Sequence, residues 1–257
     1  MRRDNPGQDN LGQSETGRSP ASSTGEERAR MVREMFDRIS GRYELLNEVM
    51  TAGMYRLWNR RVLRETELSS GDRAIDFACG TGSLTRELAR KVGTGGSVLG
   101  VDFSEKMLDA ARKRPGANIE YEWGDATHLE SIPSGSFDAA TIAYGARNIP
   151  DLEALFSEMA RVVRPGGRVV CLEIARPDNP VFARFYGLWF DSIVPWLGEK
   201  ISGDNSAYSY LPESVKAFVS PPELAAIMRN NGLQDVKWER LAGGIITLHH
   251  SSRRAGA

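Results

Sequence analysis

The sequence predicts an α/β fold in which helices flank one doubly wound, seven-stranded sheet. Short apolar runs alternate with amphipathic segments from residue 73 to residue 174, as is typical of parallel βαβ units. The first run leads into a glycine-rich turn, DFACGTG from Asp76 to Gly82, and the second run ends on Asp102. Two further strand-like segments near the C-terminus are expected to form a hairpin that completes the sheet.

The individual elements follow from periodicity and turn signals. Residues 27–66 carry apolar side chains at a spacing of three and four and are expected to be helical. Ser104 has the side chain of a helix N-cap, and the Pro165–Gly167 turn ends the amphipathic stretch that starts at Asp151. The predicted strands are 73–78, 97–102, 118–123, 137–144, 168–174, 235–240 and 244–250, and the other predicted helices are 83–91, one after Ser104, 151–163 and 221–231.

The ends of the chain and one insertion differ in composition from this core. Residues 1–27 are polar and are predicted to be a disordered tail, while residues 28–252 form a single domain. The tail has no apolar segment of the kind found in secretory signals, so we expect a cytoplasmic location. Residues 177–219 form an insertion, and its aromatic part from Val181 to Gly198 is interpreted as a packed helix that also serves as a lid or apolar channel wall, with some membrane contact.

Composition limits the function classes. The chain has 33 Lys and Arg against 34 Asp and Glu, a formal net charge of −1, which provides no field for nucleic-acid binding. Cys79 and Cys171 lie in apolar contexts and predict no disulfide framework. The three histidines lack metal-ligand spacing, so no metal site is expected.

The glycine turn indicates a nucleoside-bearing cofactor at the carboxyl edge of the sheet. A dinucleotide fingerprint would place a third glycine where the sequence has Thr85, and Asp76 would repel a pyrophosphate. An acid at this position suits a cationic ligand, and S-adenosylmethionine carries a sulfonium and an ammonium group but no phosphate. Asp102 is placed to accept hydrogen bonds from a ribose diol. The sequence therefore favours S-adenosylmethionine over a dinucleotide.

The segment YGARN, Tyr144 to Asn148, follows the fourth predicted strand and is expected to face the methyl acceptor. Arg147 cannot act as a base, but it can stabilise an oxyanion or hold a water molecule, and Asn148 can orient the same group. A salt bridge or a helix cap is the structural alternative for Arg147. Asp125 could accept a hydrogen bond from the adenine amino group or lie near the proton acceptor.

Several segments, in the right order, resemble the UbiE/MenG quinone C-methyltransferases. They include FDRISGRYELLNEVMTAGMYRLWNRRV (residues 36–62), DFACGTG, GVDFSEKML (100–108), GDA (124–126), SFDAATIAYGARN (136–148), RVVRPGGRVVCLEIARP (161–177), IVPWLGEKISGDNSAYSYLPESVKAF (193–218) and GGIITLHH (243–250). The resemblance implies the Rossmann-like fold of class I methyltransferases. It also implies methylation of a ring carbon of a prenylated demethylquinol, yielding menaquinol or, in the sister reaction, a ubiquinone precursor.

Residue roles are carried over from this family by position. The acceptor side would comprise Arg147, Asn148, Tyr208 and Tyr210. The donor site would comprise Thr81, Asp102, Asp125, Ala126 and Ala143, and the glycine-turn argument adds Asp76, Gly80 and Gly82. The family usually has serine in place of Ala143, so a contact there would come from the backbone. Ser83 and Ala146 are further departures, standing where aspartate and leucine are common.

The resemblance also suggests partners and leaves alternatives open. We expect a prenylated quinol as substrate, peripheral contact with the inner face of a membrane, and a homodimer. A methyltransferase acting on another lipid phenol or a sterol remains open, as does a non-catalytic scaffold that binds S-adenosylmethionine. A nicotinamide oxidoreductase is the third alternative.

Overall fold

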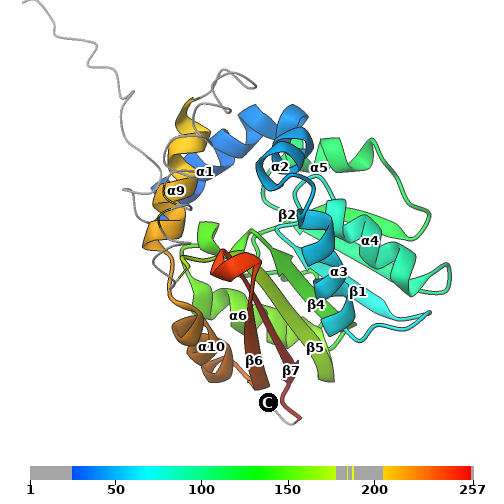
Figure 1. Cartoon of the computed structure of the whole chain (residues 1–257). Helices are drawn as coiled ribbons and strands as arrows, with labels where there is room; N and C mark the ends of the chain where they lie inside the picture. Colours follow the sequence, from blue (N-terminus) through cyan, green and yellow to red (C-terminus); the bar gives the residue numbers. More distant parts are fainter. Residues whose placement is uncertain (1–24, 178–183, 185–186, 188–204, 256–257) are drawn as a thin grey trace, which may run out of the picture.

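The computed structural model describes residues 25–177, Arg184, Gly187 and residues 205–255. These residues form a seven-stranded sheet with the order β3-β2-β1-β4-β5-β7-β6 (Figure 1). The strands are β1 (Arg73–Phe77), β2 (Ser97–Asp102), β3 (Ile119–Trp123), β4 (Phe137–Ala143), β5 (Val163–Ile174), β6 (Leu233–Leu241) and β7 (Ile246–Arg253). The predicted α/β fold with a doubly wound sheet is confirmed.

Strand direction and order determine where a ligand can bind. Strands β1 to β5 pair in parallel, whereas β7 runs antiparallel to both β5 and β6, as the predicted hairpin requires. The chain moves outward from β1 to β3 and then returns to place β4 on the other side of β1. The strand order therefore reverses between β1 and β4, and ligands of such sheets bind at the carboxyl ends of the strands at this point.

Helices cover both faces of the sheet. The helices α3 (Tyr55–Glu65) and α4 (Ser83–Val92) bury Val62, Leu84 and Leu88 against one face. The helices α6 (Leu152–Val162) and α10 (Pro221–Asn230) pack on the other face. Successive strand residues alternate between these two cores, since Ala74 faces the first and Ile75 the second.

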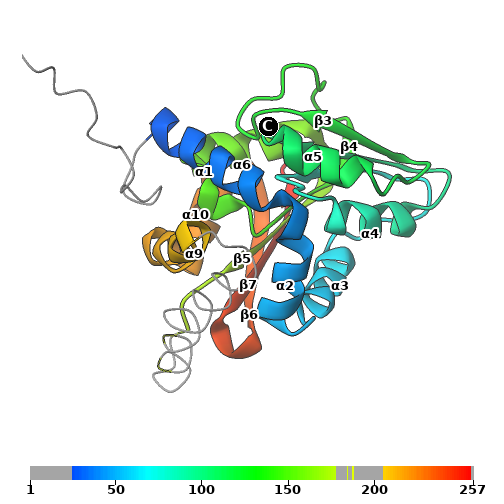
Figure 2. The same cartoon turned by 90° about the horizontal axis from the view of Figure 1, so that it is seen from above.

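A third group of helices lies above the carboxyl edge of the sheet. It includes α1 (Gly25–Ile39), a short 3₁₀ turn at Ser40–Arg42, α2 (Tyr43–Thr51) and α9 (Asn205–Ala217). Figures 1 and 2 both show α1 beside α9, two helices far apart in the sequence. Their contact forms a small core with α5 (Glu105–Arg112), whose buried members are Val32, Met35, Ile39, Met107, Tyr210, Leu211 and Val215.

The structure corrects several predicted boundaries. Helix α1 begins at Gly25, so residues 25–27 of the predicted tail are helical. The predicted helical stretch 27–66 is divided at Ser40–Arg42 and again at Ala52, which ends α2 in a left-handed conformation with φ of 47°. Strand β5 begins at Val163 and not at residue 168, because Val163 already pairs with Phe137 before a bulge formed by residues 164–167.

The predicted insertion, residues 177–219, is described only in part. Helix α9 lies within it, whereas the aromatic segment Val181–Gly198 lies outside the described residues except for Arg184 and Gly187. Within the described residues, no helix combines the length and the apolar character needed to cross a membrane.

The predicted N-cap at Ser104 is confirmed, because its side chain accepts a hydrogen bond from the Met107 N–H at 3.2 Å.

Candidate active site

A cavity of about 330 Å³ opens where the strand order reverses. The carboxyl ends of β1 to β4 form its floor, and α1 and the start of α2 contribute the opposite wall through Ala29, Arg33, Phe36 and Tyr43. A smaller cavity of about 60 Å³ adjoins it beneath α2 and α3 and shares Gly80, Ala143 and Tyr144 with it. The sheet topology therefore brings the two predicted functional loops, DFACGTG and YGARN, to one site.

Asp102 lies between the glycine turn after β1 and the turn at Ser104 after β2, and it lines the larger cavity. Its Oδ2 accepts the Gly80 N–H at 2.8 Å, and its Oδ1 accepts the Ser104 N–H at 2.9 Å. A carboxylate offers about four acceptor positions, so these two bonds leave capacity for a ligand. The side chain lines the cavity although the residue is only 5% exposed. The geometry thus presents a fixed acceptor suited to a diol.

Asp76 and Gly82, from the same heptad, occupy different surroundings. Asp76 is buried and accepts hydrogen bonds from the Thr85 and Thr141 hydroxyls at 2.7 Å each, and it lines only the smaller cavity. Gly82 lines neither cavity and has a left-handed φ of 75°, and a Cβ there would lie 2.2 Å from the hydroxyl of Tyr121. Gly82 is therefore required by the turn and by the packing of Tyr121.

Thr81 lines the smaller cavity, and its hydroxyl donates to Glu44 Oε1 at 3.1 Å. Glu44, on α2, also forms an ion pair with Arg86 at 2.8 Å and a second one with Arg114. These contacts fasten α2 over the glycine turn. Reasoning from the sequence did not single out Glu44, because no local pattern shows which residue of a helix will meet a turn 37 positions away.

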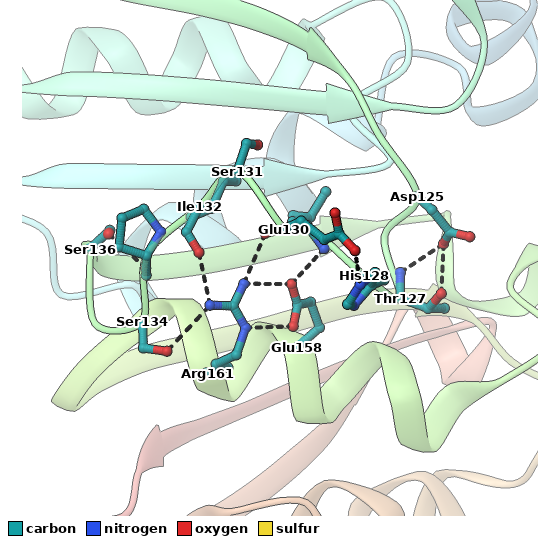
Figure 3. A network of polar contacts seen from close by, with 12 residues as sticks. Asp125, Thr127, His128, Glu130, Ser131, Ile132, Ser134, Ser136, Glu158 and Arg161 are labelled. Carbon is teal, nitrogen blue, oxygen red and sulfur yellow. Dashed lines mark hydrogen bonds and ion pairs between the residues drawn. The ribbon is translucent and has the colours of Figure 1, made fainter.

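Asp125 and Ala126 lie in the loop after β3 and line the larger cavity. Asp125 Oδ1 accepts the Thr127 N–H and the Thr127 hydroxyl at 2.8 and 2.7 Å. The rest of this loop is held on α6, where Glu158 accepts the Leu129 N–H. Figure 3 shows Arg161 of α6, which pairs with Glu158 and donates to the Ile132 carbonyl of the loop. This network fixes the loop that carries Asp125.

The end of β4 meets the end of β1 in an unusually close contact. Ala78 and Tyr144 both have left-handed backbones, with φ of 49° and 59°, and both line the two cavities. A Cβ on Gly145 would lie 2.7 Å from the Cβ of Ala78, so glycine permits the approach of the two loops. Ala143 also lines both cavities. Such backbone conformations in non-glycine residues are costly and concentrate at functional sites.

Three of the four predicted acceptor-side residues come together. The Tyr210 hydroxyl donates to Asn148 Oδ1 at 2.9 Å, which joins α9 to the loop after β4. Arg147 is 7% exposed and does not line the cavity, because Nη1 pairs with Glu173 Oε1 at 2.7 Å. Tyr208 lies on α9, but its side chain falls outside the described residues.

Glu173 was not among the candidate residues, although its position in the sequence carries a signal. It is the one acid in the apolar strand segment VVCLEI, and it is fully buried. A buried carboxylate requires a charged or hydrogen-bonding partner, and here it has Arg147 together with the N–H groups of Arg147 and Ile174. Across the described ranges, no three His, Cys, Asp or Glu side chains form a group that could hold a metal ion.

The sequence profile of the ubiE/COQ5 methyltransferase family matches residues 22–253, which include every described element from α1 to β7. The chain belongs to this family. Membership confirms the resemblance seen in the sequence, and it makes the chain a methyltransferase. It also argues against the nicotinamide oxidoreductase alternative.

Relatives within the ubiE/COQ5 family match almost the whole described domain. A protein named demethylmenaquinone methyltransferase, from Desulfitobacterium hafniense, is 39% identical over 230 residues, which is 88% of this chain and 90% of that protein. A protein named ubiquinone/menaquinone biosynthesis C-methyltransferase UbiE, from Ectopseudomonas mendocina, is 36% identical over 228 residues, covering 87% and 89% of the two chains. Both quinone types thus occur among the names of the relatives.

Solved structures support the fold at lower identity. A possible histamine N-methyltransferase from Thermotoga maritima, described as dependent on S-adenosylmethionine, is 19% identical with a TM-score of 0.59, covering 86% of this chain and 99% of that one. A methyltransferase from Aquifex aeolicus with the same dependence is 17% identical with a TM-score of 0.56, covering 75% and 88%. These similarities establish the class I methyltransferase fold of this ubiE/COQ5 member.

Proposed function

We propose that this ubiE/COQ5 family member transfers the methyl group of S-adenosylmethionine to a ring carbon of a demethylmenaquinol and so produces menaquinol. The observation that carries this proposal is the 39% identity with the Desulfitobacterium hafniense protein over 88% of the chain. The second candidate is C-methylation of a 2-methoxy-6-polyprenyl-1,4-benzoquinol, the ubiquinone precursor. The relatives named ubiquinone/menaquinone biosynthesis C-methyltransferase UbiE, with 34–36% identity, support that alternative because their name includes both quinones.

The donor end of the cavity suits S-adenosylmethionine. Asp102 would accept the ribose hydroxyls, and Asp125 with Ala126 would contact the adenine. Gly80 and Thr81 lie on the turn that would meet the amino-acid end, and Ala143 would contribute its backbone. The carboxylates of Asp76 and Asp102 favour a cationic donor over a pyrophosphate.

The acceptor end suits a flat ring that bears an apolar tail. On the side of α1 and of the loop after β4, the wall of the larger cavity includes Ala29, Phe36, Ile149 and Pro150, which can contact a hydrocarbon chain. In the proposed reaction a ring carbon of the quinol attacks the methyl carbon, and the S–CH₃ bond breaks to leave S-adenosylhomocysteine. The ring carbon then loses its proton to water, which restores the aromatic ring. Proximity and orientation dominate the rate of such a displacement.

Product analysis with the full chain tests this proposal. The protein is incubated with isotopically labelled S-adenosylmethionine and either a chemically reduced demethylnaphthoquinone or the benzoquinol, each with a short prenyl tail. We expect the label in a methylated naphthoquinol, with a higher kcat/KM than for the benzoquinol. A preference for the benzoquinol would support the second candidate. Donor binding without transfer to either ring would indicate a non-catalytic scaffold and would overturn both assignments.

The donor site is expected to depend on pH. Burial raises the pKa of Asp102 to about 6, although hydrogen bonds from the Ser104 and Gly80 N–H groups counteract part of that effect. An ionised carboxylate accepts hydrogen bonds from a ribose more strongly than a carboxylic acid does. Affinity for S-adenosylhomocysteine should therefore be constant in neutral buffer and fall as the pH drops through about 6, as measured by calorimetric titration.

Two variants test whether Asp102 or Asp76 is the source of this pH dependence. Burial also raises the pKa of Asp76 to about 6. Asp102→Asn should bind weakly with no midpoint near pH 6, whereas Asp76→Asn should keep the midpoint. A midpoint that disappears only in Asp76→Asn would assign the titration to Asp76 and contradict the ribose role of Asp102.

A further inference from the structure

The hydroxyl of Tyr144 is buried and has no hydrogen-bond partner among the described residues. Tyr144 nevertheless lines both the larger and the smaller cavity. Buried polar groups in folded proteins are almost always paired, so an unpaired one at a cavity calls for an explanation. A ligand oxygen that enters the cavity would supply the missing partner.

The backbone of Tyr144 is held in a strained conformation by several groups. Its φ is 59°, its N–H donates to the Leu172 carbonyl at 2.8 Å, and its carbonyl accepts from Arg147 Nη1 and, at 3.5 Å, from Asn148 Nδ2. Glu173 in turn holds Arg147, and the Tyr210 hydroxyl donates to Asn148. Strain of this kind persists only where the surrounding structure imposes it. The contacts of Arg147 and Asn148 therefore converge on the position of Tyr144.

We propose that the Tyr144 hydroxyl donates a hydrogen bond to a ring oxygen of the methyl acceptor and so positions the ring beside the methyl donor. This inference builds on the proposed function, because it names the residue that contacts the phenolic oxygen in that reaction. Arg147 and Asn148 then act as positioning residues that hold the Tyr144 backbone.

The acceptor is a better partner than the donor for two reasons. Asp102, Asp125 and the Gly80–Thr81 turn, on the β1–β3 side of the cavity, offer partners for the polar groups of the donor, and on the β4 side the donor would meet only the backbone of Ala143. Tyr144 begins the loop after β4, which continues through Asn148 along the cavity wall. Burial, together with the charge of Glu173, raises the pKa of Tyr144 well above its usual value. The phenol therefore stays protonated and can donate a hydrogen bond to a quinol oxygen.

The test compares Tyr144→Phe with Tyr121→Phe. The Tyr121 hydroxyl is also buried, but it packs against Gly82 and lines neither cavity. We expect Tyr144→Phe to weaken binding of a short-chain demethylnaphthoquinol to the S-adenosylhomocysteine-saturated protein by about tenfold or more, and to lower kcat/KM at least as much. Affinity for S-adenosylhomocysteine should change by less than about twofold, and Tyr121→Phe should behave like the unmodified protein in each assay.

The readouts distinguish the competing explanations. The melting temperature should not fall in Tyr144→Phe, because removal of an unpaired hydroxyl leaves no new unsatisfied group. Unchanged quinol affinity and turnover in Tyr144→Phe would overturn the inference, and a selective loss of S-adenosylhomocysteine affinity would assign the hydroxyl to the donor. The binding assay requires no turnover. Methyl transfer could therefore fail, contradicting the proposed function, while the hydroxyl-dependent contact with the quinol is still tested.

Discussion

Replacing Glu173 by glutamine is expected to lower the free energy of unfolding by about 3–5 kcal/mol, the range for breaking a buried ion pair. Glu173 is fully buried and Arg147 is 7% exposed, so the substitution leaves a guanidinium without its carboxylate in a site that water does not reach. The N–H groups of Arg147 and Ile174 bind different oxygens of Glu173, so glutamine keeps an acceptor for only one of them, and its NH₂ group faces the other donor. Denaturation with urea, followed by circular dichroism, measures the effect.

A double-mutant cycle and a surface pair provide the controls. Arg147→Met combined with Glu173→Gln should destabilise the protein by less than the sum of the two single effects, since neither charge is then left alone. Glu105→Gln removes a carboxylate from the exposed pair with Arg112 and should cost less than about 1 kcal/mol. Equal losses of unfolding free energy in Glu105→Gln and Glu173→Gln would contradict a strong contribution from the buried Arg147–Glu173 pair.

The second large effect is expected at Asp102. Asp102→Ala should weaken S-adenosylhomocysteine binding by about 1.5–3 kcal/mol, as for hydrogen bonds to a charged group, measured by calorimetry on the folded variant. The variant should also be less stable, because the N–H groups of Gly80 and Ser104 lose their acceptor. Weaker binding therefore has two sources, the lost contact with the ribose and the loosened turns.

Asp138→Ala is the matched control for this second effect. Asp138 lies near the start of β4, at the opposite edge of the sheet, and its carboxylate also accepts a backbone N–H, that of Arg73 at 2.8 Å. It additionally pairs with Arg164 at 2.6 Å. Its removal should reduce stability without changing donor affinity. Unchanged donor affinity in Asp102→Ala would remove the carboxylate from the proposed ribose site.

Much of the geometry of the candidate donor site could be predicted because its determinants are local. The glycine turn follows its strand within a few residues, and Asp102 ends the next strand. Parallel strands place their carboxyl ends at the same edge, so this order alone brings the segments together. The surroundings of Asp76 and Gly82 could not be predicted from the sequence, because they include Thr141 and Tyr121 from other strands.

On the acceptor side, the decisive contacts join distant segments and could not be predicted from the sequence. The sequence pointed to Arg147 with a salt bridge as the structural alternative, but it could not name Glu173, which lies 26 residues further along the chain. The bond between Tyr210 and Asn148 spans 62 residues and exists only because α9 packs against α1 above the sheet. The unpaired hydroxyl of Tyr144 likewise depends on everything that surrounds it.

By itself, the sequence determined the alternation of strands and helices, the glycine turn and the carboxylate at the end of the second strand. These features depend on periodicity and on the conformational preferences of neighbouring residues. The tertiary structure alone decided which charge neutralises Arg147, which residues tie α2 to the turn, and which hydroxyl faces the cavity without a partner. Burial and pairing are properties of side chains brought together from distant segments, so no local pattern specifies them.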